Sequence, residues 1–236
     1  MKAILLAAGL GTRLRPLTDS TPKCLVPING VPLLEIWIER LNRSGVGPIL
    51  INTHYLAEKV HDYVKKSSFH ELVSLVNEPV LLGTAGTLLK NLDFFIDEEV
   101  MLIHADNYCL ADLPSFMLAH KKRPSGCFLT MMTFRTKTPS SCGIVEINKN
   151  GVLVGYHEKV KSPPGNLANG AVYILTADLI KEVKSMSLAP KDFSTEVLGR
   201  FIGRIYTHET SEVFIDIGTP ESYELAKALS QSLHPS

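Results

Sequence analysis

The sequence has no excess of charge of either sign. Its 236 residues include 24 basic and 24 acidic side chains, so the formal net charge is zero. Proteins that bind nucleic acid commonly carry a basic excess, because their lysines and arginines neutralise backbone phosphates. We therefore expect no nucleic-acid partner, and any phosphate binding must depend on local groups of basic residues.

Cysteine is scarce, and the apolar runs are short. The four cysteines form no Cys-x-x-Cys pair, which argues against a zinc site or a disulfide framework; they are Cys24, Cys109, Cys127 and Cys142. We expect reduced thiols in a cytoplasmic protein. No apolar stretch is long enough to cross a bilayer, so no membrane partner is expected. The apolar N-terminal run is interrupted at Gly9, which favours a buried strand over a secretory signal.

Short apolar runs alternate with amphipathic stretches in the first half of the chain. Hydrophobic residues make up 45% of the sequence, enough for a substantial core. The predicted strands are Ala3–Ala7, Ile49–Asn52, Leu72–Val76 and Val100–His104, and the predicted helices are Leu33–Leu41, Ala57–Lys65 and Thr84–Leu92. Such alternation predicts a parallel sheet covered on both faces. Ligands of these sheets bind beyond the carboxyl ends of the strands, so we expect the site in the loops after Ala7, Val76 and His104.

The second half is richer in strand-like segments, separated by turn signals such as Asn150-Gly151. The predicted strands are Cys127–Phe134, Gly143–Ile147, Val152–Tyr156, Ala171–Leu175 and Val213–Ile215, and the predicted helices are Ala177–Ser185, Thr195–Phe201 and Thr219–Ser230. These strands are expected to extend the sheet or to form a small lobe on the substrate side. The sequence shows no repeat and no flexible linker, which predicts a single α/β domain over residues 1–236.

A loop rich in small residues, LAAGLGTRLRP, follows the first predicted strand. Glycines in such a loop let backbone N–H groups approach phosphate oxygens, and Arg13 and Arg15 add positive charge. A dinucleotide-binding fingerprint needs a third glycine where this chain has Leu14, and the Gly-Lys-Ser/Thr end of a Walker loop is absent. Taken alone, the segment could be an ordinary tight loop. Lys23, a short distance downstream, favours phosphate binding.

The motifs LLAAGLGTRLRPLT and TPKCLVPING resemble the signature of the sugar-1-phosphate nucleotidyltransferases, and GTAGT, HADN, HEK, NGAVY and DIGTP follow in the family's order. The resemblance covers nearly the whole chain. Within the family, the chain is similar to mannose-1-phosphate guanylyltransferase-like and other short single-domain members. The resemblance implies a Rossmann-like, mainly parallel mixed sheet flanked by helices, with a small β-rich lobe on the sugar side. Residues 1 to about 125 would form the nucleotide-binding half, and the remainder the sugar-binding half with the second metal aspartate.

The resemblance implies Mg²⁺-dependent attack of a sugar phosphate oxygen on the α-phosphorus of a nucleoside triphosphate, with release of pyrophosphate. Such a reaction depends on positioning and on cancelling negative charge. Arg13 and Lys23 are assigned to the triphosphate, and Asp106 and Asp216 to one Mg²⁺. Each aspartate follows or ends a predicted strand, and each alone could be a helix cap or a turn residue. They lie 110 positions apart, so only the fold can bring them together.

The resemblance also implies two sets of binding residues. The nucleotide set is Leu6, Ala8, Gly9, Gly11, Thr12, Arg13, Lys23, Glu78 and Gly83. In the sugar set, Lys159 binds the phosphate as a catalytic residue and Glu158 accepts hydrogen bonds from sugar hydroxyls, while Gly143 and Asn169 complete the pocket. A solvated pair at a sheet edge is the alternative interpretation of Glu158 and Lys159. Successive side chains of a strand point to opposite faces, so both reach one ligand only if the strand ends there.

The choice of base depends on Glu78. Thymidylyl- and many uridylyltransferases resemble one another in carrying glutamine at this position. A carboxylate only accepts hydrogen bonds, so it pairs naturally with the two adjacent donors of guanine. This favours GTP with a mannose-, heptose- or hexosamine-type 1-phosphate. Some uridylyltransferases also have glutamate here, so UTP or dTTP stays an alternative.

Two further protein classes are alternatives. A phosphocholine cytidylyltransferase shares the start of the loop motif, but its resemblance does not usually include GTAGT. A catalytically inactive sugar-nucleotide sensor tends to lose one of the charged site residues, and Arg13, Lys23, Asp106 and Asp216 are all present. The expected product is an activated sugar for a surface glycan. The sequence leaves the choice between monomer and homo-oligomer open.

Overall fold

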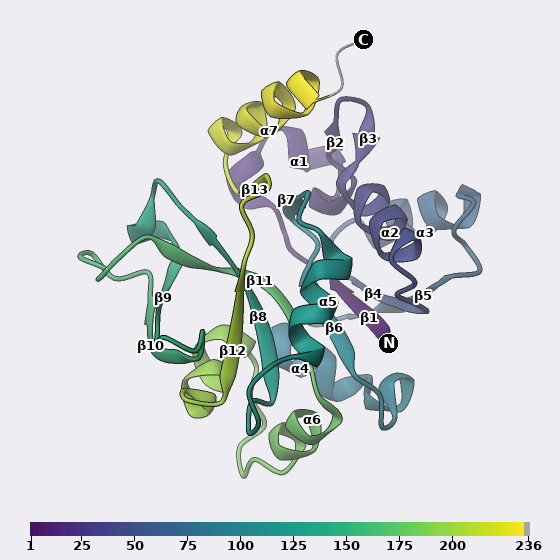
Figure 1. The fold of residues 1–236 in the computed structure, drawn as a ribbon. Helices are drawn as coiled ribbons and strands as arrows, with labels where there is room; N and C mark the ends of the chain where they lie inside the picture. The colour runs from purple at the N-terminus through teal and green to yellow at the C-terminus, as the bar shows by residue number, and fades with distance from the viewer. Residues whose placement is uncertain (234–236) are drawn as a thin grey trace. The chain divides into compact units, whose positions relative to one another are not determined.

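The structure is a computed structural model that describes residues 1–233, and its residues group into two compact units (Figure 1). The terminal unit consists of Ala3–Leu81, His104–Leu110 and the described part of Val213–Ser236. The central unit consists of Met1–Lys2, Leu82–Ile103 and Ala111–Glu212. Each unit therefore contains segments that are distant in the sequence.

The terminal unit is built on three parallel strands in the order β1-β4-β5. Its strands are β1 (Lys2–Leu6), β2 (Pro27–Ile28), β3 (Val31–Pro32), β4 (Ile49–Thr53), β5 (Val73–Asn77), β7 (Asn107–Cys109) and β13 (Phe214–Asp216). Its α-helices are α1 (Leu17–Ser20), α2 (Leu33–Arg43), α3 (Ala57–Lys66) and α7 (Pro220–Leu233), and its 3₁₀ turns are Thr12–Leu14 and Lys23–Leu25. Every residue of β4 is buried, as its apolar run Ile49–Ile51 predicts for a strand covered on both faces.

Helix α2 shows how the sequence pattern becomes packing. Its buried residues recur at helical spacing along one face of the predicted helix, namely Leu33, Leu34, Trp37, Ile38 and Leu41. After Ser44 the chain turns at Gly45 with φ of 70°, a conformation that glycine adopts without a Cβ penalty. The helix thus ends where the pattern predicts and presents Trp37 to the core.

The central unit is built around β11, which pairs antiparallel with β6, β8 and β9. Its strands are β6 (Val100–His104), β8 (Leu129–Arg135), β9 (Gly143–Ile147), β10 (Leu153–Glu158), β11 (Leu167–Leu175) and β12 (Ile205–Glu209). Its α-helices are α4 (Thr84–Lys90), α5 (Leu113–Lys121) and α6 (Ala177–Lys184). Shorter helical turns cover Leu92–Phe95, Pro139–Ser141, Phe193–Val197 and Leu198–Phe201. Strand β10 pairs antiparallel with β9, and β12 runs parallel to β8.

Most predicted elements are confirmed to within a few residues, and the α/β class with a mixed sheet is confirmed. Six strands and α-helices were not predicted: α1, β2, β3, β7, α5 and β12. Strand β11 begins earlier than predicted, because an irregularity between Asn169 and Tyr173 interrupts the strand pattern. The predicted helix Thr195–Phe201 is a π-helical turn followed by a 3₁₀ turn rather than an α-helix.

The prediction for Asp216 needs one correction. Asp216 was expected to lie, like Asp106, at the carboxyl end of a parallel strand. Its strand β13 instead pairs antiparallel with β7 in a sheet of two strands. The pairing brings a segment from the middle of the sequence beside one from near its C-terminal end. Within the same unit, α7 packs near the N-terminal strand β2 (Figure 1).

Disulfides and membrane-spanning helices, which the sequence does not predict, can be looked for in residues 1–233. All four cysteines are free, and burial raises the pKa of the Cys24 thiol to about 12. No helix in this part of the chain is long and apolar enough to cross a membrane. The prediction of a single domain stays a prediction.

Candidate active site

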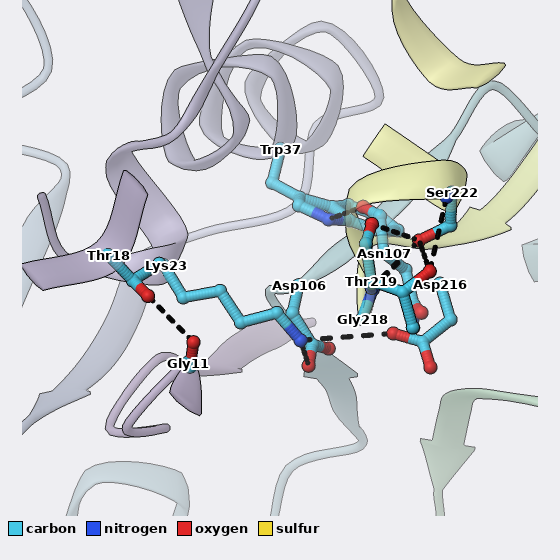
Figure 2. Close-up of polar contacts among 10 residues, drawn as sticks. All are labelled: Gly11, Thr18, Lys23, Trp37, Asp106, Asn107, Asp216, Gly218, Thr219 and Ser222. Carbon is cyan, nitrogen blue, oxygen red and sulfur yellow. Dashed lines mark hydrogen bonds and ion pairs between the residues drawn. The ribbon is translucent and has the colours of Figure 1, made fainter. Parts of the chain in front are cut away.

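Two aspartates and a lysine meet in the terminal unit (Figure 2). Lys23 Nζ lies 2.5 Å from Oδ2 of Asp106 and 3.8 Å from Oδ1 of Asp216. Lys23 begins the 3₁₀ turn after α1, Asp106 follows β6, and Asp216 ends β13. Three segments that are distant in the sequence therefore place charged groups at one point, as the sequence motifs predict.

The backbone explains how the two aspartates converge. In the antiparallel pair of β13 and β7, Asp216 lies opposite Asn107. One residue further, the N–H of Ile217 donates to the carbonyl oxygen of Asp106 at 3.0 Å. The two carboxylates are thus held by main-chain hydrogen bonds, which do not depend on a ligand.

The turn that carries Asp106 is fixed from two other sides. The indole N–H of Trp37, a fully buried residue of α2, donates to the carbonyl oxygen of Asn107 at 2.8 Å. The N–H of Ala105 donates to the carbonyl oxygen of Leu6 at 3.1 Å. Trp37 lies on the buried face of the predicted helix Leu33–Leu41 and is a core residue. Its contact beside Asp106 was not predicted, because α2 lies far from this turn in the sequence.

The electrostatics of the two aspartates differ. Burial disfavours the charged form of Asp106, but Lys23 and His104 outweigh that cost, so its pKa lies below the usual value. Burial raises the pKa of Asp216, and the nearby charge of Asp106 raises it further, against the opposing effects of Lys23 and Arg13. Two carboxylates in mutual repulsion are a suitable place for an added cation.

Arg13 contributes its charge from the loop after β1. A Cβ at Gly218 would lie 2.8 Å from Nη2 of Arg13 and 3.2 Å from Oδ2 of Asp216, so the guanidinium occupies space that any other residue would fill. The turn at Gly218 is itself fixed, because the N–H groups of Gly218 and Thr219 each lie 3.1 Å from Oγ of Ser222 (Figure 2). The DIGTP motif therefore shapes the site around Arg13 as well as supplying Asp216.

The two loop glycines have different roles. Gly11 has φ of 64°, and its carbonyl oxygen accepts a hydrogen bond from Thr18 Oγ1 at 2.7 Å (Figure 2). A Cβ at Gly11 would lie 3.0 Å from Cγ2 of Thr18, so both conformation and packing favour glycine. No heavy atom lies within 4 Å of a Cβ built on Gly9. Ala8 is buried, and Thr12 is exposed at the start of the next turn.

Glu78 is buried just after β5 and is held by two residues from the end of β4 and the loop that follows it. Asn52 Nδ2 donates to Oε1 of Glu78 at 2.9 Å, and Asn52 Oδ1 accepts the N–H of Ala7 at 2.7 Å. His54 Nδ1 donates to the carbonyl oxygen of Glu78 at 2.6 Å. Asn52 thus connects the loop after β1 to Glu78. Sequence reasoning missed this role, although a polar residue at the end of a buried strand is a recognisable signal.

Gly83 lies in the central unit, and close packing there explains why this position is a glycine. Its φ is 79°, and a Cβ there would lie 2.4 Å from the carbonyl oxygen of Lys191. The same carbonyl accepts the N–H of Ala85 at 2.8 Å. The GTAGT motif therefore anchors the segment near Lys191. The assignment of Gly83 to the nucleotide-binding residues stays a prediction.

The four predicted sugar-binding residues come together in the central unit. Glu158 ends β10 opposite Gly143 on β9, and Lys159 follows with φ of 49°, so the strand ends where the prediction requires. Lys159 Nζ lies 3.5 Å from Oε1 of Glu158. Asn169 comes from the neighbouring strand β11. Tyr156, which contacts Glu158 through its hydroxyl, was not predicted.

The predicted donor set for a metal is Asp106 and Asp216. Residues 1–233 contain no group of three or more histidine, cysteine or acidic residues that could hold a metal ion. Mg²⁺ is commonly bound through one or two carboxylates, with substrate phosphates and water as the other ligands. Two converging carboxylates, of which Asp106 raises the pKa of Asp216, fit that pattern.

A sequence model of the nucleotidyl transferase family matches residues 2–232. The chain belongs to the nucleotidyl transferase family. Among curated proteins, it is 30% identical to a putative mannose-1-phosphate guanyltransferase of Sulfolobus acidocaldarius, over 94% of this chain and 61% of that protein. It is 28% identical to D-glycero-alpha-D-manno-heptose 1-phosphate guanylyltransferase of Campylobacter jejuni, over 94% of this chain and 97% of that protein. The chain thus spans less than two thirds of the archaeal relative but nearly all of the bacterial one.

Solved structures show the same fold. A putative glucose-1-phosphate thymidylyltransferase from Bacillus anthracis, in complex with a sucrose, superposes with a TM-score of 0.86 at 22% identity over 100% of this chain and 97% of that one. HddC from Yersinia pseudotuberculosis, complexed with GMP-PN, has a TM-score of 0.80 at 27% identity over 97% and 99% of the two chains. These structures extend the α/β assignment to the full length of the described chain.

Proposed function

We propose that this protein is a sugar-1-phosphate nucleotidyltransferase, which joins a nucleoside triphosphate and a sugar 1-phosphate to give a nucleoside-diphosphate sugar and pyrophosphate. The observation that carries the proposal is the convergence of Lys23, Asp106 and Asp216, with Arg13 adjacent, in a member of the nucleotidyl transferase family. A phosphate-transfer site needs cations for the phosphates and carboxylates for a metal ion, and this cluster supplies both.

In this proposal the loop after β1 binds the triphosphate. Gly9 has open space on the side where a Cβ would lie, so a phosphate can approach the backbone there. Arg13 and Lys23 neutralise charge on the triphosphate and on the departing pyrophosphate. Leu6, Ala8, Gly11 and Thr12 shape the loop, and Gly83 completes the nucleotide set.

Asp106 and Asp216 would hold Mg²⁺. The bound ion supplies Lewis-acid stabilisation of the negative charge that develops on the phosphates. The two aspartates keep their orientation through the pairing of β7 and β13. Lys23 contacts both carboxylates and limits their repulsion. The residues present therefore fit the ion that the family resemblance implies.

The sugar 1-phosphate is bound by the central unit in this proposal. Lys159 binds its phosphate, and Glu158 accepts hydrogen bonds from its hydroxyls. Gly143 offers a backbone N–H and Asn169 a side-chain amide. The phosphate oxygen attacks the α-phosphorus directly, and no protein side chain forms a covalent intermediate. The reaction requires both sets of residues, and the family match over residues 2–232 includes both.

GTP is the proposed nucleotide. The support comes from the acceptor-only carboxylate of Glu78 and from the guanylyltransferase names of the archaeal and Campylobacter relatives. The GMP-PN complex of HddC adds a guanine nucleotide bound to the same fold. A mannose-, heptose- or hexosamine-type 1-phosphate is the proposed partner. UTP or dTTP is the alternative, favoured by the thymidylyltransferase with the TM-score of 0.86.

We further propose a cytoplasmic enzyme whose product supplies surface-glycan synthesis. An inactive sugar-nucleotide sensor is the second candidate from another class, and it needs binding residues without turnover. The four charged groups of the site are all in place, which favours the enzyme. A phosphocholine cytidylyltransferase remains a weaker enzyme alternative, distinguished by its nucleotide and acceptor.

The experiment is pyrophosphate release with Mg²⁺, in which each nucleoside triphosphate is combined with each of a panel of sugar 1-phosphates and with phosphocholine. The proposal predicts release only when both substrates are present, with the fastest release from GTP. Release from CTP and phosphocholine alone would favour the cytidylyltransferase. A folded protein that binds sugar nucleotides but releases no pyrophosphate from any pair would favour the sensor.

A further inference from the structure

We propose that Tyr156 is a positioning residue for the sugar-binding carboxylate of Glu158, and that this tyrosine makes Gly143 obligatory. The inference rests on the proposed function and deepens it, because it concerns how the sugar 1-phosphate site is organised. All the contacts that carry it lie within the central unit.

The first observation is the contact between the two side chains of β10. The hydroxyl of Tyr156 donates a short hydrogen bond to Oε2 of Glu158. On the other oxygen, Oε1, the nearest charged group is the ammonium of Lys159 at 3.5 Å. The tyrosine and the lysine therefore fix the carboxylate from its two ends. This leaves the Oε1 edge, together with the ammonium, as the face that meets a hydroxyl-bearing phosphate ligand.

The second observation is the connection to Asn169. Its Nδ2 donates to the hydroxyl of Tyr173 at 2.7 Å and lies 3.4 Å from the hydroxyl of Tyr156. Its Oδ1 accepts the N–H of Ala171 at 2.9 Å, which holds the amide in one orientation. Tyr173 is fully buried and packs against Phe193 with ring centroids 5.0 Å apart. Tyr156 thus lies between the predicted sugar-binding side chains of Glu158 and Asn169, and Asn169 is held by the buried Tyr173.

The third observation is the absence of a side chain at Gly143. A Cβ at this position would lie 2.4 Å from the hydroxyl oxygen of Tyr156 and 2.6 Å from Oε2 of Glu158. Both distances are shorter than any ordinary contact of a carbon atom. The backbone of β9 therefore approaches the Tyr156–Glu158 hydrogen bond so closely that only glycine leaves it intact.

The protonation state of Tyr156 supports a donor role. Burial raises the pKa of Tyr156, and the nearby Tyr173 raises it further, so the phenol keeps its proton. Glu158 can only accept while it is ionised, so the direction of this hydrogen bond is defined. A phenylalanine at this position would keep the ring and remove only the donor. The carboxylate would then rotate more freely, and part of the sugar-binding energy would be spent on ordering it.

The test compares Tyr156→Phe with the matched control Tyr206→Phe, which removes a tyrosine hydroxyl from β12 of the same unit, outside this network. For Tyr156→Phe we expect KM for the sugar 1-phosphate to rise about tenfold, as for a lost hydrogen bond to a charged group. KM for the nucleoside triphosphate should stay unchanged. The control should change neither KM. Equal increases in both KM values, or no change in either, would overturn the inference.

A second measurement tests the link between Gly143 and Tyr156. Gly143→Ala alone should strongly raise KM for the sugar 1-phosphate, because its Cβ displaces both the Tyr156 hydroxyl and Glu158. In the double variant Gly143→Ala/Tyr156→Phe, the hydroxyl is absent and Glu158 can move, so part of the loss should be recovered. Strictly additive losses would contradict the proposed link. If the wild-type protein transfers no nucleotide to any sugar phosphate, the proposed function itself fails, which is a different outcome.

Discussion

Asp216 lies directly opposite Asn107 in the antiparallel pair of β13 and β7, and this pairing brings its carboxylate to the side of Asp106. The two segments are far apart in the sequence, and no local pattern reports the register between them. Main-chain hydrogen bonds fix that register before any ligand is bound. The metal-binding arrangement that we propose is therefore a property of the fold of the terminal unit.

Substitution of Asp216 tests the metal role separately from stability. Asp216→Asn removes one of two mutually repelling carboxylates, so we expect stability in urea to be unchanged or slightly higher. Turnover should fall about 10³-fold or more, because a metal ligand is lost. Steady-state rates and urea unfolding measured on the same preparation check both parts. A near-normal rate would remove Asp216 from the metal site.

The two loop glycines offer a matched pair of variants. Gly9→Ala places a methyl group in open space, so folding should be unaffected while KM for the nucleoside triphosphate rises about tenfold or more. Gly11→Ala must adopt a positive φ beside Thr18, so it should cost about 1 to 2 kcal/mol of stability. Thermal unfolding and nucleotide KM values distinguish the two effects. If Gly9→Ala binds nucleotide as the wild type does, the phosphate does not approach at this position.

Glu78→Gln tests the base preference. An amide presents a donor where guanine also presents donors, so kcat/KM for GTP should fall relative to UTP and dTTP, by about tenfold for one lost charged hydrogen bond. Asn52→Ala removes the side chain that holds Oε1 of Glu78, and we expect it to shift the preference in the same direction by a smaller amount. Competition between nucleotides in one reaction gives the ratio directly. An unchanged ratio in both variants would show that Glu78 does not contact the base.

The buried His120 predicts a pH dependence of stability. Burial lowers its pKa to about 4, and the charge of Arg123 adds to this, while Glu99 opposes it. The pKa in the unfolded chain is the ordinary 6.5, so between pH 6.5 and 4 the unfolded state binds a proton that the folded state excludes. The contribution of neutral His120 to the free energy of unfolding is therefore fully present above about pH 6.5 and is lost as the pH falls.

From pH 7 to pH 5 the wild type should lose about 2 kcal/mol more unfolding free energy than His120→Gln. Glutamine removes the titrating group while keeping a polar side chain near Thr130, whose Oγ1 lies 2.7 Å from Nδ1 of His120. Urea unfolding at the two pH values measures the difference. Parallel losses in the two proteins would mean that His120 titrates normally in the folded state.

The sequence predicts the strand ends and the charged site residues because those signals are local. Asp106 follows an apolar strand, and Lys23 lies in a short proline-flanked motif, and the family resemblance of these motifs implied their roles before the fold was known. Helix α5 was missed because its pattern is weak: Leu118 is half exposed on an otherwise apolar segment. The start signal was present nonetheless, since Asp112 caps the helix by accepting the N–H of Ser115 at 3.2 Å.

The supporting contacts could not be predicted in the same way. Asn52 meets Glu78 and Ala7 only because β4 lies between β1 and β5 in the sheet. Tyr156 meets Asn169 only through the strand order of the central unit, and the irregularity in β11 sets the position of the amide. Both relationships depend on register and on side-chain direction, which a single sequence does not specify.

The most direct test of the account follows the α-phosphate itself. GTP labelled at the α-phosphorus is incubated with a sugar 1-phosphate, Mg²⁺ and protein, and the label is followed for the wild type and for Asp106→Asn and Asp216→Asn. The account predicts that the wild type moves the label into a nucleoside-diphosphate sugar, that none becomes attached to the protein, and that both variants leave it in GTP. Label that remains in GTP with the folded wild type for every sugar tested, or that becomes covalently bound to the protein, would contradict it.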